Sequence, residues 1–136
     1  MVLTPIMLDM SGYAAFLRGR AHAVDAIRAA PAILVPVTVL GELRAGFEIG
    51  MHKERNQAEL AAFLHSRRVA VVPVTEATTL RYATIYAFLR GIGRPIPTND
   101  LWIAAAAMEH SVALLTADHH FHAVPHILLE FIPADS

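Results

Sequence analysis

The sequence contains no cysteine among its 136 residues, which excludes disulfide bonds and thiolate metal sites. A reducing cytoplasm is therefore the expected compartment. Long apolar runs are also missing: the stretch 32–40 is far shorter than the ~20 residues that a membrane-spanning helix needs. Residues 1–8 carry no basic region and no small-residue cleavage pattern, so we expect neither a signal peptide nor a membrane partner.

Neither sign of charge dominates, because the net charge is only −1. The chain therefore has no global basic field that would point to a nucleic acid. Lys53 is the single lysine among eleven basic residues. Arginine suits bidentate contacts with phosphate, although high-GC codon usage would produce the same bias. Apolar residues make up 55% of the chain, above the usual range of about 45–50%. We infer that a second copy or another protein covers an exposed apolar patch.

Apolar segments that suit strands alternate with segments that suit helices. We expect strands at 2–8, 33–37, 69–74, 112–115 and 127–132. Helices are expected at 11–18, 21–30, 38–47, 53–66, 76–90, 99–110 and 118–124, with Ser11, Thr75 and Thr98 as N-caps. The apolar face of the helix at 76–90 is expected to comprise Leu80, Ala83, Ile85, Ala87, Phe88 and Leu89. This alternation predicts an α/β fold with a central, mostly parallel five-stranded sheet, helices on both faces and one domain over 1–136.

Four of the twelve acidic residues interrupt apolar segments, and these are Asp9, Glu42, Asp100 and Asp118. Seven others lie in polar helical stretches or at the tail, where acids are normally solvated: Asp25, Glu48, Glu54, Glu59, Glu76, Glu109 and Asp135. The twelfth, Glu130, also breaks an apolar run, but alternation in an edge strand can point it to water.

The four interrupting acids are expected to meet at one edge of the sheet, because ligands of parallel α/β sheets bind beyond the carboxyl ends of the strands. Crowded carboxylates repel one another and raise one another's pKa. A divalent cation with oxygen ligands, Mg²⁺ or Mn²⁺, removes this conflict. Such a cation activates water and offsets negative charge on a phosphate.

Each of these acids also has a purely structural explanation. Asp9 could end a strand, and Asp100 could favour the positive end of a helix dipole. Asp118 could cap the short helix that follows it, while Glu42 could pair with an arginine. Four such coincidences at one edge nevertheless favour a shared site.

Other kinds of site have weaker signals. His119, His120, His122 and His126 could form a zinc site, but no His-Glu-x-x-His pattern is present, and we expect them at the surface or in loops. Ser11 lacks the Gly-x-Ser-x-Gly surroundings of a nucleophile. The glycines of segment 91–97 precede no lysine–serine pair that would cradle phosphate.

The segments IMLDMSG, LGELRAG, GRPIPTNDLWIAA and LLTADHHF resemble the PIN-domain family, in particular VapC-type toxins of bacterial toxin–antitoxin pairs. The resemblance covers essentially the whole chain, and its third motif is the most specific. It implies a PIN-like fold, metal-dependent endonucleolytic cleavage of RNA, a homodimer and a cognate antitoxin that covers the active-site groove.

The resemblance also implies roles for individual residues. Asp9 and Asp100 would be the principal metal ligands, Asp118 a further ligand, and Glu42 a ligand or water-positioning base. The groups expected to orient these carboxylates are Thr98, Asn99 and Thr116.

Met10 departs from the pattern, because the family usually has threonine or serine directly after its first aspartate. The lost hydroxyl predicts weaker metal binding unless Ser11 replaces it.

The leading hypothesis is therefore a Mg²⁺- or Mn²⁺-dependent endoribonuclease. The candidates for holding the RNA backbone are Arg18, Arg44, Arg90 and Arg94, of which Arg44 could equally pair with an acid. A non-catalytic PIN-fold module that binds an antitoxin-like protein or RNA is the main alternative, and a phosphohydrolase of small phosphoesters is the third. The candidate dimer surfaces lie around Phe63 and Leu64, or around Tyr82 and Tyr86.

Overall fold

A computed structural model describes residues 4–134 and contains one five-stranded sheet in which every pairing is parallel. The strands are β1 (Ile6–Leu8), β2 (Ile33–Pro36), β3 (Val69–Val72), β4 (Ala113–Thr116) and β5 (Leu129–Phe131). Their order across the sheet is β3-β2-β1-β4-β5. The predicted parallel five-stranded sheet is confirmed; residues 2 and 3 of the expected first strand lie outside the described part of the chain.

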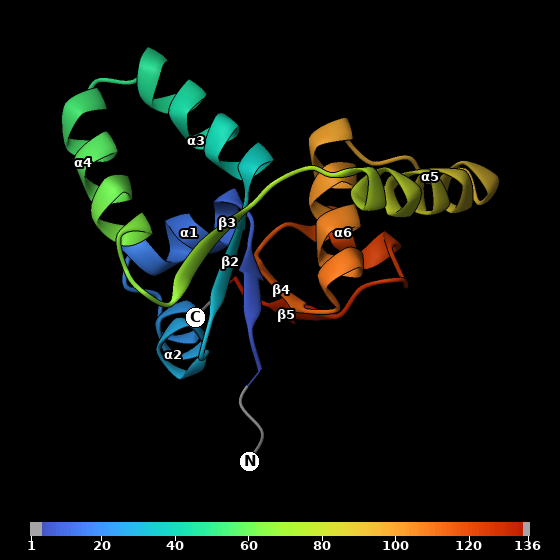
Figure 1. The fold of residues 1–136 in the computed structure, drawn as a ribbon, viewed down its shortest axis with the longest axis horizontal. Coiled ribbons are helices and arrows are strands. Elements are labelled where there is room, and N and C mark those ends of the chain that lie inside the picture. Colours follow the sequence, from blue (N-terminus) through green and yellow to red (C-terminus); the bar gives the residue numbers. More distant parts are fainter. Residues whose placement is uncertain (1–3, 135–136) are drawn as a thin grey trace.

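The helices form two groups. Helices α1 (Met10–Leu17), α2 (Ala21–Ala29), α3 (Val37–Ile49) and α4 (Lys53–Leu64) belong to connections that step toward the β3 edge. Helices α5 (Glu76–Gly91) and α6 (Thr98–His110) belong to the connection that crosses back to β4. Right-handed crossovers place the second group on the opposite face, and Figure 1 shows α3 and α4 on one side of the sheet with α5 and α6 on the other.

The core lies on both faces of the central strands. Met7 of β1 and Leu114 of β4 are fully buried, as near-continuous apolar strands require when helices cover both sides. The segment Ala104 to Ala107 of α6 is also buried, because its small side chains let the helix approach the sheet closely. The centre of the sheet is therefore a rigid base for groups at the strand ends.

Two of the three predicted N-caps are wrong. The N-cap of α1 is Asp9 rather than Ser11, because the Asp9 carboxylate accepts a hydrogen bond from the Gly12 N–H. Thr98 is the first residue of α6, and Pro97 stands at the cap with no side-chain bond. Thr75 does cap α5, where it forms a reciprocal capping box with Thr78.

The predicted inner face of α5 is wrong in most of its positions. Only Ile85 and Leu89 are buried, while the others are exposed: Leu80, Ala83, Ala87 and Phe88. The buried stripe instead includes Thr78, whose hydroxyl donates to the Glu109 carboxylate of α6 at 2.5 Å. Glu109, expected to be solvated, is thus a hydrogen-bond acceptor between two helices.

The surplus of apolar residues does reach the surface, as the composition predicts. The most exposed large apolar side chains are Ile49 and Met51 at the α3–α4 turn, at 91% and 93%, and Leu128 at 69%. Glu130 on edge strand β5 is partly exposed and contacts His22 at 3.0 Å. Within residues 4–134, no helix combines the length and apolar character needed to cross a membrane.

Candidate metal centre

The site lies where the chain's connections change direction across the sheet, between β1 and β4. These strands are neighbours, with Leu8 opposite Leu115, and connections leave them toward opposite edges. Asp9 directly follows β1, and Asp118 stands two residues beyond β4. Such a switch point is the usual ligand position of an open α/β sheet.

The other two acids come from helices on opposite faces that meet above this point. Glu42 lies in α3, Asp100 lies in the first turn of α6, and α3 contacts α6. The charge of Glu42 interacts with those of Asp100, Asp9 and Asp118. The structure therefore brings together the four acids that the sequence singles out.

Asp9 is the most deeply buried of the four, with only 4% of its surface exposed. One oxygen, Oδ1, accepts from the Gly12 N–H at 2.8 Å, and the other, Oδ2, accepts from the Thr116 hydroxyl at 2.6 Å. The Ser11 hydroxyl lies 2.8 and 2.9 Å from the two oxygens. Three donors, one backbone N–H and two hydroxyls, therefore contact the carboxylate and fix its orientation.

Ser11 supplies the hydroxyl that Met10 does not. Its oxygen also accepts the Ala117 N–H at 2.9 Å, which ties α1 to the segment after β4. Met10 is instead 44% exposed and lines a surface hollow beside Glu42 and Asn99. The departure at position 10 therefore leaves Asp9 with a hydroxyl partner one residue later.

Gly12 is a structural requirement that sequence reasoning missed. A β-carbon at this position would lie 2.3 Å from the Leu115 carbonyl oxygen and 3.4 Å from Asp9 Oδ1. Only glycine allows α1 to approach β4 this closely while its N–H caps onto Asp9. The one available signal was the spacing Asp-x-x-Gly at a helix start.

Asp100 and Asp118 converge on a histidine. His120 Nδ1 lies 2.9 Å from Asp100 Oδ2 and 3.1 Å from Asp118 Oδ1. Asp118 also caps the 3₁₀ helix η1 (His119–Ala123) by accepting the His120 N–H at 2.9 Å. Within residues 4–134, these three residues are the one group of at least three potential ligands close enough together to hold a metal ion.

Burial is the main cause of altered acidity at this site. It raises the pKa of Asp9, although the hydrogen bond from Thr116 opposes the rise. Burial, together with repulsion from the other acids, raises the pKa of Glu42 and of Asp100. A hydrogen bond from Asn99 partly lowers the pKa of Glu42, and a hydrogen bond from His120 partly lowers the pKa of Asp100.

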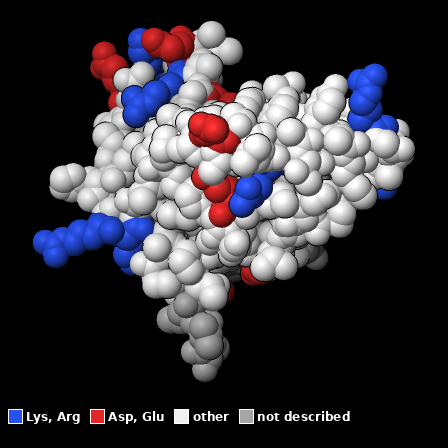
Figure 2. All heavy atoms as spheres, turned by 45° about the vertical axis from the view of Figure 1, so that its right-hand side comes forward, with Lys and Arg blue, Asp and Glu red and all other residues white. Residues whose placement is uncertain are grey.

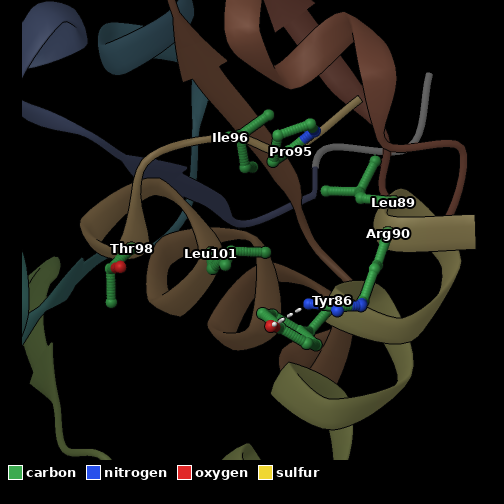
Figure 3. Close-up of a pocket in the computed structure, with 7 residues that line it drawn as sticks. All are labelled: Tyr86, Leu89, Arg90, Pro95, Ile96, Thr98 and Leu101. Atoms are coloured by element: carbon green, nitrogen blue, oxygen red, sulfur yellow. Dashed lines mark hydrogen bonds between the residues drawn. The ribbon is translucent and has the colours of Figure 1, made fainter. Parts of the chain in front are cut away.

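Of the three orienting groups expected from the sequence, two contact the acids and one does not. Thr116 donates to Asp9 and accepts the Asp118 N–H at 2.9 Å, so one hydroxyl links two acids. Asn99 bonds to Glu42. Thr98 instead lines a cavity of about 230 Å³ together with Tyr86 and Arg90, as Figure 3 shows.

The four candidate arginines do not form one basic surface. Arg94 lines a hollow with His119 and with His120, and His120 in turn contacts Asp100. Arg90 donates to the Tyr86 hydroxyl at 3.3 Å in the separate cavity of Figure 3. Arg18 and Arg44 are exposed, and the salt bridges within residues 4–134 do not include Arg44. On the face seen in Figure 2, a small acidic group lies near the centre with one basic side chain beside it, and the other basic side chains lie toward the edges.

The four histidines near the C-terminus do not converge on one site. The rings of His119 and His122 both pack on Phe131, at 4.8 and 4.5 Å. His126 contacts Phe88 on α5 at 5.0 Å. The alternative of a four-histidine zinc site is therefore not supported by the geometry, whereas His120, expected to be a surface residue, joins the acids.

The donor set fits a divalent cation. Asp100, Asp118 and His120 each offer one ligand atom within 4.8 Å of the others, and Glu42 adds a fourth negative charge nearby. A cation would remove the repulsion that raises the pKa of Glu42 and Asp100. Carboxylates with one imidazole are ligands that Mg²⁺ and, more readily, Mn²⁺ accept.

Comparisons with known proteins agree with this geometry. The model of the PIN domain matches residues 6–127. The chain is 33% identical to Ribonuclease VapC4 of Mycobacterium tuberculosis over 68% of this chain and 72% of that protein. It is 28% identical to Ribonuclease VapC5 of the same organism, over 87% and 86% of the two chains. A chain in the crystal structure of VapBC2 from Rickettsia felis, bound to a DNA fragment from its promoter, matches with a TM-score of 0.81. The two chains are 26% identical, and the match covers 92% of this chain and 96% of that chain.

Proposed function

The chain belongs to the PIN-domain family, and from this premise we propose that it is a VapC-type toxin of a type II toxin–antitoxin pair. Its activity is that of an endoribonuclease, which hydrolyses RNA phosphodiester bonds with Mg²⁺ or Mn²⁺ as cofactor. One domain over 1–136 carries this activity. The observation that supports it most is the meeting of Asp9, Glu42, Asp100 and Asp118 at the β1–β4 switch point.

Each acid has a separate part in the proposed chemistry. Asp100 and Asp118 would hold the cation, and Glu42, which lines an open hollow, would orient the attacking water. Asp9, which the resemblance makes a principal ligand, is buried and has hydrogen-bond donors on both oxygens, so in this proposal it acts mainly through its negative charge and by fixing the position of α1. When bound, the cation lowers the pKa of water and offsets charge on the phosphate.

The scattered arginines suit contacts with single phosphates better than a long basic groove. Arg94, in the hollow next to His120, is the best placed for the phosphate beside the scissile bond. Arg90 lies farther along, across Pro95 and Ile96, which line both the hollow and the cavity of Figure 3. Arg18 and Arg44 stay weaker candidates because neither lines the hollow that contains Glu42 or the hollow that contains His120.

We also propose two protein partners. A VapB-like antitoxin is inferred from relatives whose structures are VapBC complexes, from Rickettsia felis and Mycobacterium tuberculosis among others. A second copy of the chain is inferred from the apolar stripe of Leu80, Ala83 and Ala87, which α5 presents to solvent. Phe63 packs on Tyr13 at 5.2 Å, so its surroundings offer less apolar surface to a partner.

The non-catalytic alternative rested on Met10 and the hydroxyl that it lacks. Since the Ser11 hydroxyl contacts both oxygens of Asp9, the structure favours the active enzyme. A phosphohydrolase of small phosphoesters remains the other hypothesis, and a parallel assay with p-nitrophenyl phosphate distinguishes it.

The test is cleavage of a structured RNA by the antitoxin-free protein and by its Asp100→Asn variant. We expect cleavage with Mg²⁺ or Mn²⁺ that EDTA abolishes, and loss of at least about a hundredfold in the variant, since removal of one charged ligand costs several kcal/mol of metal-dependent stabilisation. Asp25→Asn on the exposed side of α2 is the matched control and should retain full activity. Full activity of Asp100→Asn, or cleavage undiminished by EDTA, would refute the proposal.

A further inference from the structure

His120 is the imidazole that contacts the acidic centre, and its placement is unlike that of its neighbours. His119 and His122 pack their rings on Phe131, whereas the His120 ring turns toward Asp100 and Asp118. Its backbone N–H is bonded to Asp118 Oδ1 at 2.9 Å, so the start of η1 holds the residue beside that acid. The side chain is 54% exposed, so burial does not account for its orientation.

We propose that His120 is a metal ligand, and that it makes this centre a mixed nitrogen–oxygen site selective for Mn²⁺ over Mg²⁺. This inference rests on the proposed function, because it concerns the cation that the ribonuclease uses. It goes further by naming the ion and the residue that selects it.

The distances suit a shared cation. Neighbouring ligands of an octahedral ion with bonds of about 2.1 Å are separated by about 3.0 Å. His120 Nδ1 lies 2.9 Å from Asp100 Oδ2 and 3.1 Å from Asp118 Oδ1, so both pairs already have the spacing of adjacent ligands. Small movements of three side chains would then suffice to accept an ion.

The ligand types decide the preference. Mg²⁺ is a hard cation that takes oxygen ligands and gives up its waters reluctantly. Mn²⁺ accepts imidazole more readily and stands above Mg²⁺ in affinity for nitrogen. One imidazole among carboxylates therefore raises the affinity for Mn²⁺ with little gain for Mg²⁺.

A different role for the same contacts predicts the opposite result. A protonated His120 could stand in for a cation by pairing with Asp100 and Asp118, and a metal would then have to displace it. Removing the ring would in that case strengthen metal binding. If His120 is a ligand, removing the ring weakens metal binding.

The experiment measures Mn²⁺ and Mg²⁺ affinities by titration calorimetry for the wild type, His120→Ala and the control His122→Ala, which alters the same short helix. We expect Mn²⁺ affinity to fall about tenfold in His120→Ala, the lower end of the effects seen at metal-site positions, and Mg²⁺ affinity to change far less. His122→Ala should match the wild type for both ions. Equal or tighter Mn²⁺ binding by His120→Ala would overturn the proposal.

Pulsed EPR of bound Mn²⁺ gives a readout that does not depend on activity. The wild type and His122→Ala should show coupling to an imidazole nitrogen, and His120→Ala should lose it. Metal binding and RNA cleavage without this coupling would refute the role of His120 and leave the ribonuclease standing. A wild type that binds neither ion would refute both.

Discussion

Replacing Gly12 with alanine should destabilise the protein, although alanine is the better helix former. The added β-carbon would lie 2.3 Å from the Leu115 carbonyl oxygen, so α1 must move away from β4. Overpacking of this kind costs about 1–3 kcal/mol. The shift also weakens the bond from the Gly12 N–H to the Asp9 carboxylate, and hydrogen bonds to charged groups contribute about 1.5–3 kcal/mol.

The higher helix propensity of alanine offsets about 1 kcal/mol of this loss of stability. The net loss of unfolding free energy is therefore about 1.5–5 kcal/mol, a large part of the roughly 5–15 kcal/mol that stabilises a typical domain. The assay is urea denaturation of the metal-free protein, followed by circular dichroism. Because Asp9 moves with α1, Mn²⁺ affinity should fall as well.

Gly46→Ala is the matched control, because Gly46 also lies inside a helix but a β-carbon there meets nothing within 4 Å. It should raise the unfolding free energy by about 0.5–1 kcal/mol. The two substitutions are chemically identical and have opposite expected signs. A Gly12→Ala variant as stable as the wild type, or stabilised like Gly46→Ala, would show that the close approach of α1 to β4 does not constrain this position.

Two further predictions concern pH and self-association. The folded protein raises the pKa of Glu42 and of Asp100, so it binds a proton at each carboxylate more tightly than the unfolded chain does. In EDTA its Tm should therefore fall as the pH rises from about 4 through the raised pKa values. Mn²⁺ and Glu42→Gln should each reduce this fall, and a Tm that climbs over the same range would contradict the assignment. Leu80→Glu combined with Ala87→Glu should convert the proposed dimer to a monomer in sedimentation experiments, while Ile49→Glu at the α3–α4 turn should not. A dimer that survives the α5 changes would place the interface elsewhere.

The alternation of short apolar strands with helical segments was enough to predict the parallel sheet and its order of elements. The signals were local: apolar runs bounded by residues such as Pro31, and changes of period such as that after Val37. The α5 helix shows the limit of this reasoning, because two of its sides are apolar. The side of α5 that carries Thr78 is buried, and there Thr78 bonds to Glu109, while the other apolar side of α5 is exposed. Thr78 and Glu109 are 31 positions apart, so no local pattern indicates which side is buried.

The features of the candidate site also divide into those that the sequence could predict and those that it could not. The sequence by itself determined which acids follow strands or begin helices, because each position depends on a local pattern, and it thereby indicated Asp9 and Asp118. Only the tertiary structure decided that Thr116 bonds to Asp9, that Gly12 must lack a side chain and that His120 faces Asp100. The physical reason is that these contacts depend on the register of β1 against β4 and on how α6 approaches η1, and both join segments that are distant along the chain.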